Sequence, residues 1–209
     1  YLGSLISAAY VRGYQGDDLS AQNTVVSCFK HFAAYGAAQA GRDYHTVDMS
    51  DRELRQTYLP PYKAALDAGA GTVMTSFNEI DGVPASGSSY LLKDILRKEW
   101  GFQGCVVTEY TSINEMVPHG IVANLKGAAE LAANAGVDMD MQGAAYYEHL
   151  AELVAEGKVK ESEVDASVRS ILYLKFVLGL FDDPYRYMDV ERQEQTLFSQ
   201  PHRDAAREL

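Results

Sequence analysis

The stretch Gly104–Tyr110, GCVVTEY, decides the fold of this chain. It is a short run of apolar and β-branched residues that ends in a carboxylate, and similar runs occur at Thr24–Phe29, Thr72–Ser76 and Val137–Met141. Short, nearly continuous apolar runs are typical of strands that are buried on both faces, as in a parallel sheet. The runs that start at residues 72, 105 and 137 lie 33 and 32 residues apart, which is the size of a βα unit. The sequence therefore predicts an α/β fold in which parallel strands alternate with helices.

Helical patterns with start and stop signals occupy the intervals between these runs. Ser50 and Glu53 have the spacing of a capping box, and the apolar residues after them recur at helical spacing. Pro60-Pro61 should break or kink that helix, because proline lacks an N–H and clashes with the preceding turn. Further helices, each followed by a glycine that would end it, are predicted at Ser89–Trp100, Leu125–Ala135, Ala144–Glu156 and from a cap at Ser162 to Leu178.

Composition and charge exclude several classes of protein. Apolar residues make up 47% of the 209 residues and charged residues 22%, as in globular proteins with a core. The 18 basic and 29 acidic residues give a net charge of −11 without a basic cluster, so no nucleic-acid partner is expected. No run approaches the roughly 18 apolar residues that a membrane span needs, so no membrane partner is expected.

Motifs for metal ions and cofactors do not occur in the sequence. Cys28 and Cys105 lie inside apolar runs and are interpreted as buried thiols, and no zinc-type grouping of His and Cys is present. Gly69-Ala70-Gly71 precedes a strand instead of opening a helix, so it is not a dinucleotide-binding loop. We therefore expect no metal ion and no cofactor, and we set aside a Rossmann-like binding module.

The pattern of elements predicts one part of a larger barrel. A closed parallel barrel needs eight strands and about 250 residues, whereas four strand runs are visible here. The chain opens in a helical pattern, and a polar stretch precedes the last residues, which start like a helix at Pro201. We expect residues 1–181 to form the C-terminal half of a (β/α)8 TIM-type barrel, residues 182–199 an interdomain linker, and residues 200–209 the start of a second domain.

Polar side chains follow the predicted strands at their carboxyl ends, where α/β proteins place their active sites. Lys30-His31 follow the first run, Asn78-Glu79 the second, Glu109-Tyr110 the third, and Asp138–Gln142 end the fourth. We expect these residues to converge on one mouth. Carboxylates, a cation and an imidazole bond hydroxyl groups, and aromatic rings cover an apolar face, so the mixture suits a sugar.

Glu109 is the sharpest catalytic candidate. A carboxylate directly after a central strand has to be paired, hydrogen-bonded or functional, because burial of a lone charge is costly. Position alone does not separate catalysis from its structural alternative, which is a salt bridge between Glu109 and Lys30.

Three weaker candidates also have structural alternatives. His31 has the alternative of a core histidine bonded to a backbone carbonyl, and Met74 that of a core side chain. For Arg42 the structural alternative is an ion pair with Asp43. Arg42 and Asp43 both lie in the loop 33–49, which is long enough to cover a pocket.

Seven short motifs are spread along nearly the whole chain. They are KHFA (30–33), GRDY (41–44), LPPY (59–62), MTSFN (74–78), WGFQG (100–104), AGVDM (135–139) and GLFDDPY (179–185). Together and in this order they resemble glycoside hydrolase family 3, and most closely its bacterial β-glucosidases of the periplasmic type.

The resemblance implies a two-domain enzyme, in which a (β/α)8-type barrel is followed by an α/β sandwich. It implies removal of a terminal β-linked glucose with retention: one carboxylate attacks the anomeric carbon, and a second carboxyl group acts as acid and then as base. The resemblance places the nucleophile at Glu109. It places sugar-binding groups at Lys30, His31, Met74 and Tyr110 and, across loop gaps, at Arg42.

The chain departs from the family pattern at the nucleophile. The family uses aspartate there, and Glu109 has one methylene more, which extends its reach by about 1.5 Å. A misplacement near 1 Å can cost about a hundredfold in rate, so an impaired enzyme is expected. In part of the family a tyrosine hydroxyl stands near the nucleophile, and here that position is Phe77. The acid/base glutamate and one sugar-binding aspartate would lie outside this chain.

Two other functions remain open. A β-xylosidase of the same family is not separated by contacts within this chain, and a catalytically dead carbohydrate-binding pseudoenzyme is compatible with Glu109, since binding can survive loss of chemistry. The N-acetylglucosaminidase branch is disfavoured, because Lys30-His31-Phe32 continues as Ala33-Ala34-Tyr35-Gly36 without that branch's Asp-x-His dyad. The expected partner is a β-linked glucoside or oligosaccharide. The resemblance also allows a homodimer and implies a periplasmic or secreted location.

Overall fold

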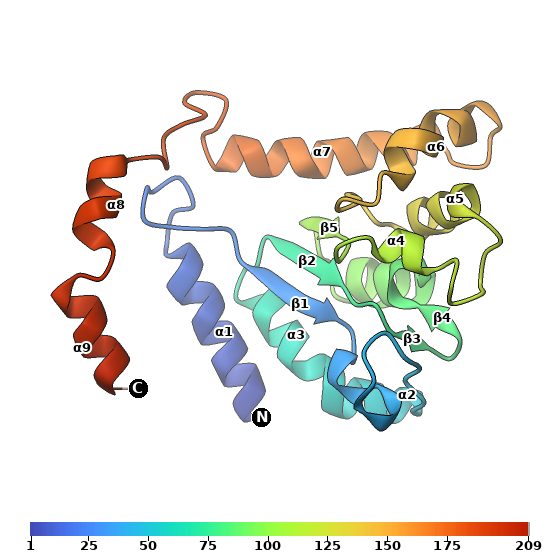
Figure 1. Ribbon diagram of the computed structural model, residues 1–209, viewed down its shortest axis with the longest axis horizontal. Helices are drawn as coiled ribbons and strands as arrows, with labels where there is room; N and C mark the ends of the chain where they lie inside the picture. Colours follow the sequence, from blue (N-terminus) through green and yellow to red (C-terminus); the bar gives the residue numbers. More distant parts are fainter. Residues whose placement is uncertain (209) are drawn as a thin grey trace.

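The computed structural model describes residues 1–208 and shows an α/β architecture built on a parallel sheet (Figure 1). Three strands pair in the order β1-β2-β5, and both pairs are parallel. A short antiparallel hairpin of β3 and β4 follows the central strand. The strands are β1 (Cys28–Phe32), β2 (Thr72–Thr75), β3 (Glu79–Ile80), β4 (Val83–Pro84) and β5 (Cys105–Val107).

A fourth parallel segment continues the sheet beyond β5. Met139 forms a parallel bridge with Val107, and the Thr108 N–H donates to the Met139 carbonyl at 3.0 Å. The Asp138 N–H donates to the Val106 carbonyl at 2.9 Å. The four predicted runs therefore lie side by side in chain order, which confirms the α/β class and the barrel-type arrangement of the strands.

The first strand starts four residues later than predicted, at Cys28 instead of Thr24. Side-chain hydrogen bonds hold the residues before it. The Thr24 hydroxyl donates to the Ala21 carbonyl at 2.8 Å, and the Ser27 N–H donates to Gln15 Oε1 at 2.9 Å. Since Gln15 lies at the end of helix α1, this approach to the sheet is set by a contact that apolar periodicity does not reveal.

Helices connect the strands and cover the sheet. Figure 1 shows α1 beside α3 near β1, α5 and α6 together at the other end of the sheet, and α7 as a long helix along one side. The α-helices are α1 (Leu2–Gln15), α2 (Asp51–Glu53), α3 (Leu59–Asp67), α4 (Ser112–Glu115), α5 (Leu125–Ala135), α6 (Ala145–Ala155), α7 (Glu161–Val177), α8 (Val190–Thr196) and α9 (Gln200–Glu208). Two segments are π-helical, η3 (Leu54–Tyr58) and η5 (Tyr90–Glu99), and three are 3₁₀ turns, η1 (Tyr35–Ala37), η2 (Gln39–Gly41) and η4 (Ala85–Gly87).

Local signals explain most helix ends. The Ser50 hydroxyl accepts the Glu53 N–H at 3.2 Å, as the capping-box spacing predicts. Pro60 lies in the first turn of α3, where its missing N–H is not needed, so the double proline opens a new helical segment. The prediction of a cap at Ser162 is wrong: Ser162 lies inside α7, and the cap residue is Lys160.

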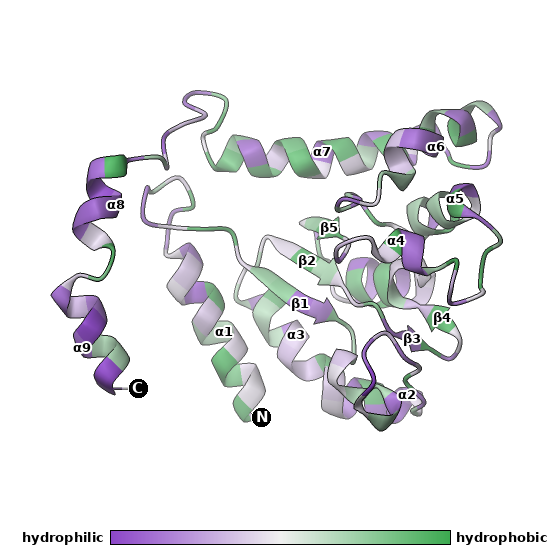
Figure 2. Ribbon diagram, in the orientation of Figure 1, coloured by the Kyte–Doolittle hydropathy of each residue, from purple (hydrophilic) through white to green (hydrophobic). Residues whose placement is uncertain are grey.

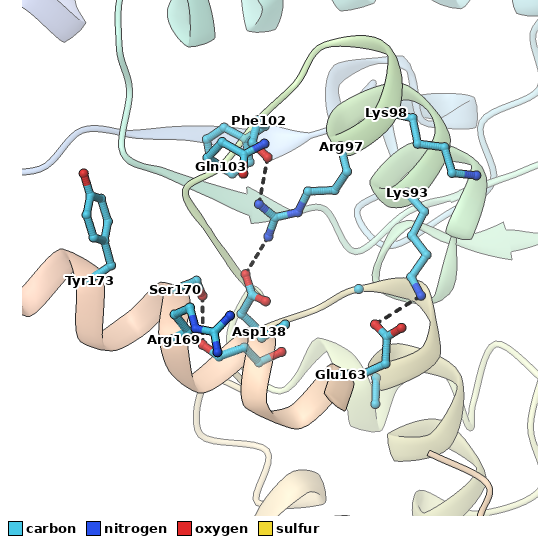
Figure 3. A pocket seen from close by; sticks show the side chains of 14 residues that line it. Lys93, Arg97, Lys98, Phe102, Gln103, Asp138, Glu163, Arg169, Ser170 and Tyr173 are labelled. Atoms are coloured by element: carbon cyan, nitrogen blue, oxygen red, sulfur yellow. Dashed lines mark hydrogen bonds and ion pairs between the residues drawn. The ribbon is translucent and has the colours of Figure 1, made fainter. Parts of the chain in front are cut away.

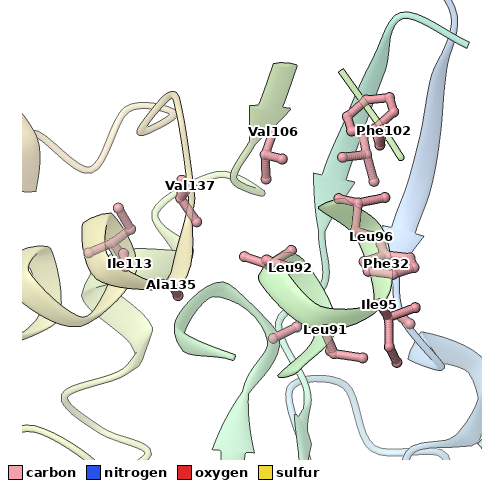
Figure 4. Packing of buried hydrophobic residues seen from close by; sticks show 14 of the residues in the cluster. Phe32, Leu91, Leu92, Ile95, Leu96, Phe102, Val106, Ile113, Ala135 and Val137 are labelled. Atoms are coloured by element: carbon pink, nitrogen blue, oxygen red, sulfur yellow. The ribbon is translucent and has the colours of Figure 1, made fainter. Parts of the chain in front are cut away.

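The core lies between the sheet and the helices that pack on it. Figure 4 shows side chains of η5 next to Phe32 of β1 and near Val106 of β5. Phe32, Leu92, Ile95 and Val106 are all fully buried. The apolar stripe of η5 therefore packs in one core with β1, which carries His31, and with β5, which leads to Glu109.

The two C-terminal helices differ from the rest of the molecule in position and polarity. Figure 1 shows α8 and α9 beyond α1, away from the sheet, and Figure 2 shows them as mostly hydrophilic. α8 lies within the expected linker 182–199 and α9 within 200–209, and the domain assignment itself stays a prediction. Within residues 1–208, every helix is too short or too polar to cross a bilayer.

Candidate active site

Glu109 and His31 form the centre of the candidate site. Glu109 lies two residues beyond β5, and His31 lies within β1. His31 Nε2 is 2.6 Å from Glu109 Oε2, and the Tyr110 N–H donates to the other carboxylate oxygen at 3.1 Å. The side chains of His31 and Glu109 are 23% and 17% exposed, so a ligand from solvent can still reach them. Two donors therefore hold this carboxylate in a fixed direction at the carboxyl end of the strands.

The electrostatic surroundings keep His31 uncharged. Partial burial lowers the pKa of His31 below its ordinary value, and the positive charge of Lys30 lowers it further. The negative charges of Glu109 and Asp43 act in the opposite direction without reversing the shift. At neutral pH the imidazole is therefore neutral, and the proton on Nε2 is donated to Glu109. This leaves Nδ1 of His31 as a hydrogen-bond acceptor.

We predict that Lys30→Met raises the pKa of His31, because it removes the nearby positive charge. Glu109→Gln should lower the pKa of His31, because it removes a negative charge that favours the protonated ring. The measurement is an NMR titration of the His31 ring in the protein that contains this chain. Lys98→Met is the matched control, since Lys98 pairs with Asp94 on an exposed helical face. Shifts in the same direction for Lys30→Met and Glu109→Gln would contradict this account.

Aromatic side chains of the loop after β1 form a wall beside the central pair. The Tyr35 ring centroid lies 4.9 Å from that of His31, and the Tyr35 hydroxyl donates to Asp43. Phe77 packs on Tyr35 and on Tyr44, with ring centroids 6.3 and 4.3 Å apart. Burial and the hydrogen bond to Asp43 raise the pKa of Tyr35, so its hydroxyl stays a donor. The wall offers ring faces of the kind that pack on a sugar.

The other residues predicted to bind sugar differ in exposure. Lys30 and Arg42 are exposed, and Tyr110 is 55% exposed. Met74 is 9% exposed and lies in β2 opposite Val107 of β5. The structure therefore places Lys30, Tyr110 and Met74 on or beside the strand ends that carry the central pair, and Arg42 in the long loop.

In residues 1–208 the structure contains neither of the two ion pairs that are the structural alternatives for Glu109 and Arg42. Within residues 1–208, no ion pair joins Lys30 to Glu109, and the partner of Glu109 is His31 instead. Lys30 is exposed, whereas the His31 side chain is partly buried beside Glu109, so these two neighbours in β1 do not share a partner. Likewise no ion pair joins Arg42 to Asp43 in this part of the chain; Asp43 accepts a hydrogen bond from Tyr35, which the loop brings back toward it.

Asp138, predicted to join the mouth, points away from the candidate site. Its carboxylate is 2.7 Å from Arg97 Nη2 and accepts the Val106 N–H at 2.7 Å. Arg97 also donates to the carbonyls of Phe102 and Gly104, at 3.0 and 2.7 Å, just before β5. Figure 3 shows this ion pair beside a cavity of about 680 Å³ between η5 and α7. The amino-terminal side of a barrel contributes to stability rather than to catalysis, so we interpret this cluster as structural.

Replacing Asp138 with alanine should lower the free energy of unfolding by about 2 kcal/mol, because Arg97 loses its partner and the Val106 N–H its acceptor. The Arg97 side chain is 26% exposed, which keeps the loss below that of a fully buried pair. Asp94→Ala removes the exposed Lys98–Asp94 pair and should cost less than about 0.5 kcal/mol. Denaturant unfolding of the protein that contains this chain measures the stability of both variants. An equal loss of unfolding free energy in Asp138→Ala and Asp94→Ala would contradict a structural role for Asp138.

Sequence reasoning missed the residues that hold the long loop. Glu79, expected at the mouth, instead accepts the Thr46 hydroxyl proton, and its backbone carbonyl accepts the Val47 N–H at 2.8 Å. His119 Nδ1 lies 3.8 Å from Glu79 Oε2. Tyr35 was also missed, although it follows the KHFA motif by only two residues. Nothing in the local sequence marks the contact of Glu79 with Thr46 and His119, because Glu79 lies in β3 and the other two residues lie in separate loops.

The possible metal ligands in the described part of the chain form no larger group, and both thiols are at least partly buried. Within residues 1–208, no group of three or more His, Cys, Asp or Glu side chains is arranged to hold a metal ion. Cys105 is buried and Cys28 partly buried, and both are free. Burial raises the pKa of Cys28, and it raises that of Cys105 to about 11, so both stay protonated near neutral pH.

Comparison with known proteins gives consistent matches along the chain. The family model described as glycosyl hydrolase family 3 N terminal domain matches residues 1–174. A periplasmic β-glucosidase of Salmonella typhimurium is 42% identical over 212 residues, which cover 100% of this chain and 28% of that protein. A β-xylosidase of Formosa agariphila is 36% identical over 220 residues, which cover 100% of this chain and 30% of that protein.

A solved structure shows the same arrangement in three dimensions. The crystal structure of a mutant β-glucosidase from Listeria innocua in complex with laminaribiose superposes with a TM-score of 0.93 at 44% sequence identity. The match covers 96% of this chain and 28% of that one. The chain thus spans less than a third of the length of these relatives, so what it provides is one part of a longer architecture.

Proposed function

Because the chain belongs to glycosyl hydrolase family 3, we propose that the protein containing it is an exo-acting β-glucosidase. It removes terminal β-D-glucosyl residues from non-reducing ends of glucosides, laminaribiose among them, and retains the anomeric configuration. The observation that carries the proposal is the Glu109 carboxylate beyond β5, held 2.6 Å from His31, in a chain 42% identical to a β-glucosidase.

Glu109 is the proposed nucleophile. Its carboxylate attacks the anomeric carbon, the bond to the leaving oxygen breaks, and a second carboxyl group about 5–5.5 Å away protonates that oxygen. The same second group then deprotonates a water, which releases glucose from Glu109. We expect this second group from a part of the protein outside this chain. The His31 N–H and the Tyr110 N–H keep the Glu109 carboxylate directed during both steps.

The proposed glycone contacts surround this carboxylate. An exposed ammonium and a guanidinium donate to sugar hydroxyls, while a thioether and a phenol ring cover apolar edges of the ring. His31 adds an acceptor at Nδ1 beside its donor to Glu109. These contacts are Lys30, His31, Met74, Tyr110 and Arg42.

Because glutamate stands at the nucleophile position, we expect hydrolysis to be slower than with aspartate there. The longer side chain displaces the attacking oxygen, and a displacement near 1 Å costs about a hundredfold in rate. The same residue supports a second candidate, a sugar-binding protein without turnover, because the glycone contacts do not depend on the attack. A β-xylosidase is the third candidate, and the relative of that name with 36% identity supports it.

Hydrolysis of an aryl β-D-glucoside and of an aryl β-D-xyloside by the protein that contains this chain separates these functions. A higher kcat/KM for the glucoside supports the proposal, and a higher value for the xyloside supports the β-xylosidase. Binding of glucose without turnover of either substrate identifies the pseudoenzyme. Proton NMR of the first product should show the β anomer, and an α anomer would exclude retention.

We also propose a periplasmic or secreted location, which the name of the Salmonella typhimurium relative supports. Recovery of the activity in the periplasmic fraction or the medium of the source cells tests it. Recovery with the cytoplasmic fraction alone would overturn it.

A further inference from the structure

The turn that carries Glu109 is anchored to two neighbouring parts of the molecule. Glu109 lies between Thr108, the first residue after β5, and Ser112, the first residue of α4. The Ser112 N–H donates to the Glu109 carbonyl at 3.1 Å, which closes the turn. One anchor joins the end of this turn to β2, and the other joins its start to the segment 139–141.

The anchor to β2 consists of three buried hydroxyl groups. Ser112 Oγ lies 2.7 Å from Ser86 Oγ, which lies 2.7 Å from Thr75 Oγ1 in β2. The three residues are at most 3% exposed. This anchor holds the start of α4, and the start of the turn depends on other contacts.

Thr108 forms the second anchor with its side chain. Its hydroxyl oxygen accepts the Met141 N–H at 2.8 Å, and its own N–H donates to the Met139 carbonyl at 3.0 Å. On the other side of Glu109, the Thr111 N–H donates to the Met141 carbonyl at 3.0 Å. Glu109 therefore lies between two residues that both bond Met141. Of these three bonds, only the one to the Thr108 hydroxyl depends on a side chain, so a substitution can remove it and keep the backbone groups in place.

The segment that Thr108 binds is itself held firmly. The Tyr146 N–H of α6 donates to the Asp140 carboxylate at 3.2 Å, and the Tyr146 hydroxyl donates to the Val137 carbonyl at 2.9 Å. Residues on both sides of Met139 are thus tied to α6. Because this segment is fixed, its bond to Thr108 also restricts the movement of the turn at Glu109.

The Thr108 hydroxyl is well suited to hold the turn in one position. Thr108 is 0% exposed, so bulk water does not compete for the Met141 N–H. Its β-branched side chain has restricted freedom about χ1, which keeps the acceptor in one direction. A buried N–H that loses its acceptor is costly, so we expect the backbone of Thr108 and Glu109 to move when the hydroxyl is removed. The anchor at Ser112 remains, so the fold itself should persist.

We propose that Thr108 is a positioning residue, whose hydroxyl holds the turn so that the Glu109 carboxylate stays beside His31 and directed at the anomeric carbon. The inference rests on the proposed function, because the direction of this carboxylate affects a rate only if Glu109 attacks the sugar. Thr108 is fully buried, so it does not contact the sugar itself. Its loss should therefore slow the attack and leave the binding of glucose unchanged.

Kinetics of Thr108 variants in the protein that contains this chain test the inference. Thr108→Val keeps the shape of the side chain and removes the acceptor. The value of kcat/KM for an aryl β-D-glucoside should then fall about tenfold or more, because a displacement near 1 Å costs about a hundredfold. The dissociation constant of glucose, measured by calorimetry, should not change. Thr108→Ser keeps the hydroxyl and should restore most of kcat/KM.

The matched control is Thr72→Val, the same change at the start of β2, where the Thr72 hydroxyl donates to the Ser27 carbonyl at 3.2 Å. Its kcat/KM should equal that of the parent. Thr108→Ala removes the same acceptor and replaces Thr108→Val in the comparison if the valine variant does not fold. The inference would be overturned by an unchanged kcat/KM without the hydroxyl, by an equal loss in Thr108→Ser, or by an equal weakening of glucose binding.

A readout that needs no turnover separates this inference from the proposed function. The negative charge of Glu109 raises the pKa of His31, and Lys30 and Asp43 are the other charges that act on the ring. Thr108→Val should lower the pKa of His31 in an NMR titration, because the carboxylate moves away from the ring. The serine variant should leave this pKa unchanged. In a Glu109→Gln background, Thr108→Val should cause no further shift, because the charge is already absent.

The two measurements give different outcomes for the two proposals. A protein that turns over no glucoside but shows the lower pKa of His31 refutes the proposed function and retains Thr108 as the residue that positions the carboxylate. An active protein in which removal of the Thr108 hydroxyl leaves the pKa of His31 unchanged refutes the positioning role and leaves the β-glucosidase standing. In an active protein, a lower pKa of His31 without a loss of kcat/KM also refutes this role, because the position of the carboxylate would then not limit the attack.

Discussion

Glu109→Asp should raise kcat/KM for an aryl β-D-glucoside by about a hundredfold or more, in the protein that contains this chain. The family resemblance places aspartate at this position, and the added methylene of glutamate moves the carboxylate by about 1.5 Å. In the structure the longer side chain reaches His31 at 2.6 Å, so its position is set by that hydrogen bond. With aspartate the side chain is shorter, so the carboxylate moves away from His31 and toward the end of β5. This is the position that the family's aspartate would occupy.

Two controls make this first experiment decisive. Glu109→Gln removes the nucleophile and should abolish the residual activity of the glutamate form. Glu148→Asp makes the same change on exposed α6 and should alter kcat/KM less than twofold. Equal or higher activity of the glutamate form would show that the pocket has adapted to the longer side chain or that Glu109 is not the nucleophile.

Gly104→Ala should cost about 3 kcal/mol of unfolding free energy, in the upper range for overpacking. An added Cβ would overlap the carbonyl oxygen of Gly71 and lie 2.6 Å from a ring carbon of Phe102. The Gly71 carbonyl cannot withdraw cheaply, because it accepts the Cys105 N–H at 3.1 Å where β2 and β5 begin to pair. The substitution therefore forces apart the two strands that position Glu109.

Gly13→Ala is the matched control for this second experiment. Gly13 lies in α1, and an added Cβ would meet no heavy atom within 4 Å. The change should stabilise the protein by about 0.5–1 kcal/mol, since alanine loses less backbone entropy in a helix than glycine does. Denaturant unfolding with a constant m-value measures both variants. A Gly104→Ala protein as stable as its parent would mean that the two strands are not in close contact at this point.

The helix signals show how far local sequence reaches. The prediction of α5 over Leu125–Ala135 matches the structure at both ends, because the side chain of Asn124 caps the first turn and Gly136 adopts a left-handed φ of 102° after the last. The cap at Ser162 failed because α7 starts two residues earlier, with its cap at Lys160, and no side chain caps its first turn. Local signals are reliable where a side chain itself satisfies the helix end, and weaker where packing sets the boundary.

The candidate site shows the limit of the same reasoning. The place of Glu109 after β5 followed from the apolar run before it, but its partner did not. Asp138 lies within an equally clear run, yet its carboxylate turns toward Arg97 and not toward the mouth. Both residues are carboxylates in or directly after short apolar runs, so sequence pattern treats them alike. The difference comes from Arg97, which η5 places next to the start of β5.

The sequence by itself determined the α/β class, the chain order of the parallel strands, and the position of Glu109 at a strand end. These features depend on apolar periodicity and capping, which act between neighbours a few residues apart. Only the tertiary structure decided that His31 and not Lys30 pairs with Glu109, that Tyr35 binds Asp43, and that Glu79 accepts the hydroxyl of Thr46 from the long loop. These contacts join residues from separate loops and strands, and their geometry depends on which face each strand presents and on the packing that sets strand register.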